Sequence, residues 1–282
     1  MKNNLSIIIA HYYPENSEYE NPLIKTLETI NNDYQLNKNL EVIIADDGSS
    51  YSNTIMNDYS TKINIENDFR DIFVLNNEKL KSFLKKNSID YSFIKSWVYL
   101  PKLVKCMSKA RVLNYAYKFS ENDNLLFLDD DNYFISNNSS QNTMELLDKY
   151  SFVVGQIKDN NGRLRHFKSN RVQGTTIGIK KNILDDIKGF SEWTEEFSCG
   201  IDSDLWIRIY DYFINNDMRA CYTNKLSTYD SHSKRWGKFT KIFKDWYIRK
   251  KFKELYQIKN YKKAYYNLSR QKEIWIENLI NE

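Results

Sequence analysis

The sequence of 282 residues predicts an α/β fold with a mostly parallel central sheet flanked by helices. Buried strands are expected at 5–10 (LSIIIA) and 40–45 (LEVIIA), because each is a short apolar run without alternation. A helix is expected between them, since Asn21 can cap a helix that Pro22 starts. Strand, helix and strand joined by short links form a βαβ unit, whose two strands are parallel.

The composition is that of an ordinary globular chain, with 41% hydrophobic and 28% charged residues. A net charge of +4 is too small to indicate a nucleic-acid-binding protein. Three cysteines, Cys106, Cys199 and Cys221, match no zinc or disulfide spacing, which predicts reduced thiols in the cytosol. No apolar run approaches the ~20 residues that span a bilayer, and the first is too short for a signal peptide. We therefore expect a soluble, cytoplasmic protein.

The same reasoning predicts the remaining elements along the chain. Further strands are expected at 72–76, 125–129, 151–157, 172–179 and 220–224. Further helices are expected at 78–86, 103–119, 141–149, 180–187 and 205–213. The stretch 87–100 has no clean period, and 159–170, 189–204 and 229–239 are expected to be loops.

Two of the predicted strands end in acidic clusters. Asp46 and Asp47 follow the second strand, and Asp129, Asp130 and Asp131 end the middle strand in LLFLDDDN. Ligands of open α/β sheets bind outside the carboxyl ends of the strands, and hard divalent cations prefer carboxylate oxygens. The alternative is that each cluster is a solvated acidic turn.

Six motifs occur in an order that resembles a known family. They are SIIIAHYY, IIADDGSS, KARVLN, LFLDDDN, KGFSEW and GIDSDLWIR, and they span about residues 5–210. In this order they resemble glycosyltransferases with the GT-A fold, and are most similar to the inverting family 2 enzymes. No single motif is specific, but the ordered set is.

This resemblance implies a Rossmann-like GT-A fold and a C-terminal helical extension. The glycosyltransferase domain is expected at 1–238, with a nucleotide-sugar half at about 1–132 and an acceptor half at about 133–238. Residues 239–282 are expected to form a basic amphipathic helical extension, since twelve Lys and Arg face five Asp and Glu from Lys238 onward. Such a helix can lie on an anionic membrane surface, or it can pack its apolar stripe onto the domain.

For the nucleotide, the resemblance implies that Tyr12 stacks on the base. It assigns one carboxylate of the pair Asp46 and Asp47 to the imide N–H of uracil. The alternative for this pair is structural, because Asp followed by Gly makes a good turn.

For the diphosphate, the resemblance implies that Asp129 and Asp131 are the two acids of a D-x-D motif that holds Mg²⁺ or Mn²⁺. Asp131 is expected to be the direct ligand, with Asp129 nearer the ribose and donor sugar. Asp130 belongs to this donor-binding triplet and is interpreted as the spacer. Arg111 is expected to reach the same charges from the preceding helix, or else to be a surface arginine.

For catalysis, the resemblance matches Asp202 to the base that takes the proton of the acceptor hydroxyl. Asp204 is a nearby alternative on the acceptor side, although capping of the following helix is its simpler role. His232 could complete the metal shell or face the diphosphate. Arg235 and Trp236 resemble an R-W pair that contacts diphosphate and acceptor sugar in processive family members.

The sequence departs from the family pattern at several positions. Tyr13 stands where Asn is usual, Ser191 replaces an Asp, and Ile201 replaces the Glu of an acidic pair. The Arg111 element has two extra residues before Asn114.

The predicted activity is a metal-dependent inverting transfer of a sugar from a nucleotide donor, preferably UDP-linked. The predicted acceptor is a carbohydrate or lipid-linked molecule in surface-glycan assembly of a bacterium, with no nucleic-acid partner. The substitution at Ile201 leaves a non-catalytic nucleotide-sugar or glycan-binding module as the alternative. A sugar-phosphate nucleotidyltransferase would need a Gly-rich basic loop after the first strand, and HYYPENSEYEN has none.

Overall fold

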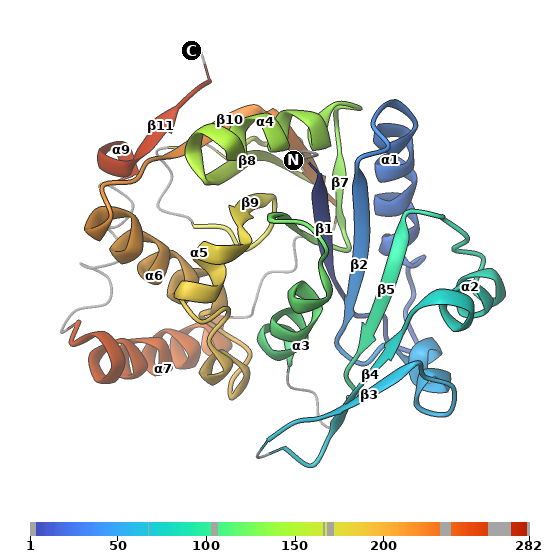
Figure 1. Ribbon diagram of the computed structural model, residues 1–282. Coiled ribbons are helices and arrows are strands. Elements are labelled where there is room, and N and C mark those ends of the chain that lie inside the picture. Colours follow the sequence, from blue (N-terminus) through green and yellow to red (C-terminus); the bar gives the residue numbers. More distant parts are fainter. Residues whose placement is uncertain are drawn as a thin grey trace.

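The computed structural model describes residues 4–66, 68–102, 107–165, 167, 172–231, 238–258 and 272–280. One mixed sheet crosses the molecule and carries helices on both faces (Figure 1). Its strand order is β11-β10-β8-β9-β6-β1-β2-β5-β4-β3, and β7 pairs with β10 beside this path.

The strands follow the predicted apolar runs and add several short ones. They are β1 (Leu5–His11), β2 (Leu40–Asp46), β3 (Thr61–Asn64), β4 (Asp71–Leu75), β5 (Ile94–Tyr99), β6 (Asn124–Asp129), β7 (Asn132–Phe134), β8 (Phe152–Asp159), β9 (Ile177–Lys180), β10 (Ala220–Asp230) and β11 (Ile276–Asn278).

The described helices connect these strands. They are α1 (Pro22–Leu36), α2 (Asn77–Lys86), α3 (Lys109–Ala116), α4 (Ser139–Tyr150), α5 (Lys181–Asp186), α6 (Ile201–Asn215), α7 (Lys238–Tyr256) and α9 (Lys272–Trp275). As predicted, the Asn21 side chain caps α1 by accepting from the Leu23 amide, and Pro22 is its first residue.

The centre of the sheet is parallel, as the βαβ pattern predicts. The adjacent strands β6, β1, β2 and β5 run parallel to one another. In this register Ala10 pairs with Asp129, and His11 pairs with Asp46. The acidic ends of β2 and β6 therefore lie on either side of the end of β1, at one edge of the sheet.

Alternate residues of β1 supply two separate cores, one on each face of the sheet. Ile8 and Ala10 pack in the core that includes residues of α3, α6 and α7. Ile7 and Ile9 pack in the core that includes residues of α1, α2 and α4. Burial of both faces explains why the strand is continuously apolar, and the predicted α/β fold is confirmed.

Three elements differ from the prediction. The strand expected at 172–179 is the shorter β9, which is antiparallel to both β6 and β8. The stretch 87–100 contains β5, whose six residues are too few to show a period. The strand expected at 220–224 is the first part of β10, which continues to Asp230. It is not the last strand, because β11 follows it in the chain and pairs with it.

Within the described ranges, no helix combines the length and the apolar character needed to cross a membrane.

Candidate active site

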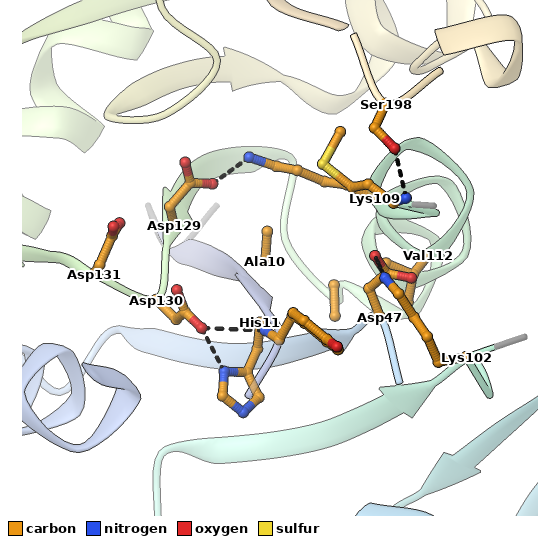
Figure 2. Close-up of a pocket in the computed structure, with 13 residues that line it drawn as sticks. Ala10, His11, Asp47, Lys102, Lys109, Val112, Asp129, Asp130, Asp131 and Ser198 are labelled. Carbon is orange, nitrogen blue, oxygen red and sulfur yellow. Dashed lines mark hydrogen bonds and ion pairs between the residues drawn. The ribbon is translucent and has the colours of Figure 1, made fainter. Parts of the chain in front are cut away.

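A cavity of about 410 Å³ opens at the edge of the sheet where β1, β2 and β6 end (Figure 2). The loop after β5, the start of α3 and the segment before α6 complete its wall. The lining residues are Ala10, His11, Tyr12, Ala45, Asp47, Lys102, Met107, Lys109, Val112, Asp129, Asp130, Asp131 and Ser198.

The adjacent carboxylates of Asp46 and Asp47 have different environments. Asp46 is fully buried, and its two oxygens accept from the Ser49 amide at 2.7 Å and from the indole N–H of Trp97 at 2.9 Å. Asp47 lines the cavity, and its Oδ2 accepts from Lys102 Nζ at 2.6 Å and from the Ser108 amide at 2.9 Å. Among the described residues, Asp47 Oδ1 has no hydrogen-bond partner.

Asp46 is therefore a structural carboxylate, and Asp47 is the member of the pair that a ligand in the cavity can use. Burial raises the pKa of Asp47, and the ammonium of Lys102 opposes this effect.

Tyr12 and Lys102 form one side of the cavity. The Tyr12 side chain is 44% exposed, and Lys102 Nζ lies 4.3 Å from the centre of its ring. This cation–π contact covers one face of the ring. Lys102 thus contacts both the aromatic ring and the carboxylate that were predicted to bind the base.

The three consecutive aspartates at the end of β6 point in different directions (Figure 2). Asp129 accepts from Lys109 of α3. Asp130 accepts from the Tyr12 amide at 3.1 Å, and its Oδ2 is 2.7 Å from Nδ1 of the buried His11. The Asp131 carboxylate accepts only from Asn132 Nδ2, at 2.7 Å, among the described residues. The contacts of Asp130 hold its side chain against the end of β1.

Asp131 is an acid without a cationic partner among the described residues. Burial, and then the charges of Asp129, Asp130 and Asp230, raise the pKa of Asp131 to about 8. A divalent cation would relieve this repulsion, and carboxylates are the ligands that Mg²⁺ and Mn²⁺ prefer.

The described residues contain no group of three acidic, His or Cys side chains arranged to hold a metal ion. A cation held by one or two carboxylates, with substrate phosphates and water as its other ligands, needs no such group. Asp129 and Asp131 therefore fit a cation that is shared with a bound diphosphate.

The prediction that Arg111 reaches this acidic cluster is wrong, because the residue two positions earlier does so. Lys109 pairs with Asp129, and the charges of Asp129, Asp202 and Asp131 raise its pKa against the effect of burial. Arg111 instead pairs with Asp68 and with Glu192 Oε2, at 2.9 Å. These positions differ by two residues, or about 200° around a helix, so their side chains leave α3 on different faces.

Asp202 lies in the first turn of α6 and acts electrostatically on Lys109. Gly174 lies against its carboxylate, since a Cβ at Gly174 would be 2.0 Å from Asp202 Oδ1. The start of α6 thus brings Asp202 to the charges at the end of β6.

Asp204 does not fit an acceptor-binding or a capping role. It is fully buried, and it accepts from Trp193 Nε1 at 3.0 Å, from Arg208 Nε at 2.9 Å and from the hydroxyl of Tyr256. The first residue of α6 is Ile201 and the cap position is Gly200. Asp204 is one turn too late to cap the helix, and it instead joins α6 to α7.

No protein-family model and no curated protein matches this chain. Solved structures do match, and residues 1–349 of TarS from S. aureus superpose with a TM-score of 0.57 and 14% identity over 96% of this chain and 72% of that one. The mannosyltransferase PcManGT from Pyrobaculum calidifontis, solved with GDP-Man and Mn²⁺, superposes with a TM-score of 0.54 and 13% identity over 95% of this chain and 68% of that one. The chain has the GT-A glycosyltransferase fold.

The glycosyltransferase fold also matches TarS 1–349 in complex with UDP-GlcNAc, with a TM-score of 0.51 and 18% identity over 84% of this chain and 60% of that one. The chain spans 37% of the length of the longer TarS structure, at a TM-score of 0.52. Of these similar structures, one TarS complex contains UDP-GlcNAc and the PcManGT complex contains GDP-Man.

Three predicted site residues, His232, Arg235 and Trp236, lie outside the described residues. Three cavity residues with titratable side chains were not predicted to be functional, namely His11, Lys102 and Lys109. Lys109 lies in the KARVLN motif, so its position before Arg111 was a usable signal. Lys102 follows β5, the strand that the sequence did not reveal.

Proposed function

We propose that this protein is a metal-dependent inverting glycosyltransferase that uses a UDP-linked sugar. The observation that carries the proposal is the cavity at the carboxyl edge of the sheet. Asp47, the DDD turn and Lys109 line it, and the start of α6 brings Asp202 to the same charges. Its acceptor is a carbohydrate or lipid-linked molecule of surface-glycan synthesis.

The environment of Asp47 favours uracil over guanine as the donor base. Uracil presents one imide N–H to an acceptor, whereas guanine presents its N1–H and amino group together. Lys102 and the Ser108 amide already use Oδ2 of Asp47, which leaves only the buried Oδ1 to accept a hydrogen bond from the base. Tyr12 stacks on the base from the same side of the cavity.

Asp129 and Asp131 hold the divalent cation, which offsets the negative charge that develops on the departing diphosphate. Lys109 adds a positive charge beside these acids and balances their repulsion in the free protein. The acidic pair and the lysine together bind the diphosphate end of the donor.

Asp202 is the proposed catalytic base. It takes the proton of the acceptor hydroxyl as that oxygen attacks the anomeric carbon from the face opposite the diphosphate. The bond from the anomeric carbon to the diphosphate oxygen breaks, and the nucleoside diphosphate leaves with the electron pair. The configuration at the anomeric carbon is inverted by this single displacement.

The proposal is tested by incubating the protein with a panel of UDP- and GDP-sugars and Mn²⁺, and measuring the released nucleoside diphosphate. We expect release from a UDP-sugar that requires Mn²⁺ and is lost in Asp131→Asn. Asp148→Asn is the matched control, because this aspartate lies on α4 and its side chain is 55% exposed. No release from any donor, together with intact UDP binding, would identify a non-catalytic binding module.

A second variant tests the base. Asp202→Asn should keep its affinity for UDP but lose transfer by roughly 10²- to 10⁴-fold, the usual contribution of general base catalysis. Transfer at the wild-type rate would remove Asp202 from the mechanism.

A further inference from the structure

Helix α7 has an inner face that packs on the wall of the cavity. Tyr247, Ile248 and Phe252 on this face are buried. The Tyr247 ring lies 4.5 Å from that of Phe197, and Lys244 Nζ donates to the carbonyl oxygen of Ser198 at 3.0 Å. Because Ser198 also lines the cavity, a residue of α7 contacts the wall of the proposed donor site directly.

The outer face of α7 exposes four large apolar side chains. Phe239 is 88% exposed, Ile242 60%, Phe243 46% and Trp246 56%. Their spacing of three, four and seven residues places them on the side of the helix away from Ile248 and Phe252, and Phe243 at the border also contacts the Phe197 ring, with ring centres 5.0 Å apart. A contiguous exposed apolar patch of this kind marks an interaction surface. In Figure 1, α7 lies at the lower left, below α6.

Basic residues continue the same outer face toward the C-terminal end of α7. Three exposed basic residues follow the four apolar side chains at helical spacing, namely Arg249, Lys250 and Lys253. The helix contains seven Lys and Arg against two Asp and Glu, a balance of +5, whereas the whole chain has a net charge of +4. The positive charge of the protein is therefore concentrated beside its exposed apolar patch.

We infer that this face of α7 lies on the surface of an anionic lipid bilayer. The four exposed apolar side chains of α7 would enter the boundary between head groups and acyl chains, where aromatic side chains are favoured. The basic side chains of Arg249, Lys250 and Lys253 would meet the negative head groups, which attract lysine and arginine close to the surface. A second copy of the chain is a poor occupant, because two helices of charge +5 repel each other.

This placement holds the cavity beside the bilayer surface. A lipid-linked acceptor, which is confined to that surface, is then favoured over a free carbohydrate. The choice of acceptor rests on the proposed transfer, whereas bilayer binding does not and is measured without donor or acceptor.

The test is sedimentation of the full chain with vesicles of phosphatidylcholine alone, or with about one third phosphatidylglycerol. We expect binding to the anionic vesicles, weaker binding at high salt, and little binding to the neutral ones. The double variants Phe239→Ser with Trp246→Ser, and Lys250→Glu with Lys253→Glu, should each weaken binding at least ~10-fold.

Two matched control variants test whether vesicle binding depends on this face of α7 or on any exposed aromatic side chain or positive charge. Phe69→Ser removes an 85% exposed aromatic side chain from the loop after β3, and Lys85→Glu with Lys86→Glu reverses two exposed charges on α2. Both controls should bind as the wild type does. The inference fails if the wild type does not bind anionic vesicles, or if the controls lose as much binding as the α7 variants. It also fails if Trp246→Ser dissociates a dimer in analytical ultracentrifugation, which would assign the face to a second copy.

Discussion

Asp46 and Asp47 are neighbours in the chain, but their side chains have different surroundings. Asp46, the last residue of β2, meets Trp97 in the core, and Asp47, which follows the strand, meets Lys102 and the cavity. The end of β2 thus separates a structural carboxylate from the proposed binding carboxylate. Sequence analysis identified both aspartates as candidates for binding the base, but the sequence contains no signal that distinguishes them.

At the residue scale, Asp47→Asn should weaken UDP binding by about 10- to 100-fold. The amide oxygen of Asn must face Lys102 and the Ser108 amide, so its NH₂ group would face the donor N–H of uracil. Calorimetric titration with UDP and with GDP checks this result.

Asp46→Asn is the control for this change. It should lower the free energy of unfolding by about 1–3 kcal/mol, because one buried donor loses its acceptor. It should leave the ratio of UDP to GDP affinity unchanged. An equal loss of UDP affinity in both variants would contradict the assignment.

At the scale of an element, the first turn of α6 depends on a glycine in another part of the chain. Gly174→Ala would place a Cβ 2.0 Å from Asp202 Oδ1, so the carboxylate must move. We expect kcat to fall by about 10²-fold with unchanged UDP affinity, because misplacement by about 1 Å is enough for such a loss.

Gly178→Ala is the matched control for Gly174→Ala. Its Cβ would meet Thr143 Cγ2 at 3.1 Å and Leu147, and both of these residues belong to α4. It should reduce stability and leave kcat near the wild-type value. A Gly174→Ala enzyme with normal kcat would separate Asp202 from the chemistry.

The 3₁₀ turn Glu192–Glu195 (η3) and the start of α3 form a second charged element. The Arg111 amide donates to Glu195 Oε1 at 2.8 Å. Burial nevertheless raises the pKa of Glu195 to about 7, despite the opposing charge of Arg111. Between its ordinary pKa near 4.5 and about 7, the folded protein holds a proton that the unfolded chain has lost. The free energy of unfolding therefore falls as pH rises through this range.

Glu195→Gln should remove this dependence, since the amide stays neutral. Urea unfolding should show a variant that is about 1–3 kcal/mol more stable than the wild type near pH 8, with a smaller difference near pH 5. Glu192→Gln, whose side chain is 45% exposed, is the control and should change stability by less than ~0.5 kcal/mol. A wild-type advantage near pH 8 would show that Arg111 needs the charged carboxylate.

At the scale of the whole molecule, the C-terminal segment both closes the core and carries an exposed face. Trp275 is 1% exposed and stacks on Phe152 of β8, with ring centres 6.0 Å apart. Strand β11 then pairs with β10 at the end of the sheet. Of the two alternatives for this segment, the structure shows packing for Trp275 and β11, whereas contact with a membrane stays a prediction for the exposed face of α7.

Two tryptophans of this segment make a matched pair. Trp275→Ala should lower the free energy of unfolding by about 3–5 kcal/mol, as for other buried aromatic side chains. Trp246→Ala, at 56% exposure, should change it by less than ~1 kcal/mol. Chemical denaturation of the two variants measures both values, and equal losses would contradict the packing described for Trp275.

The sequence by itself determined strands β1, β2 and β6 and the acidic ends of β2 and β6, whereas the GT-A fold was expected from the resemblance of its ordered motifs. These strands and the start of α1 follow from local properties, because a strand buried on both faces must be apolar throughout and a helix must be capped. Only the tertiary structure decided that Lys109 rather than Arg111 reaches Asp129, that Asp204 is buried, and that β11 completes the sheet. Each of these depends on which residues distant in the chain lie on the same face. Local patterns carry no information on that choice, because it is made by packing of whole elements.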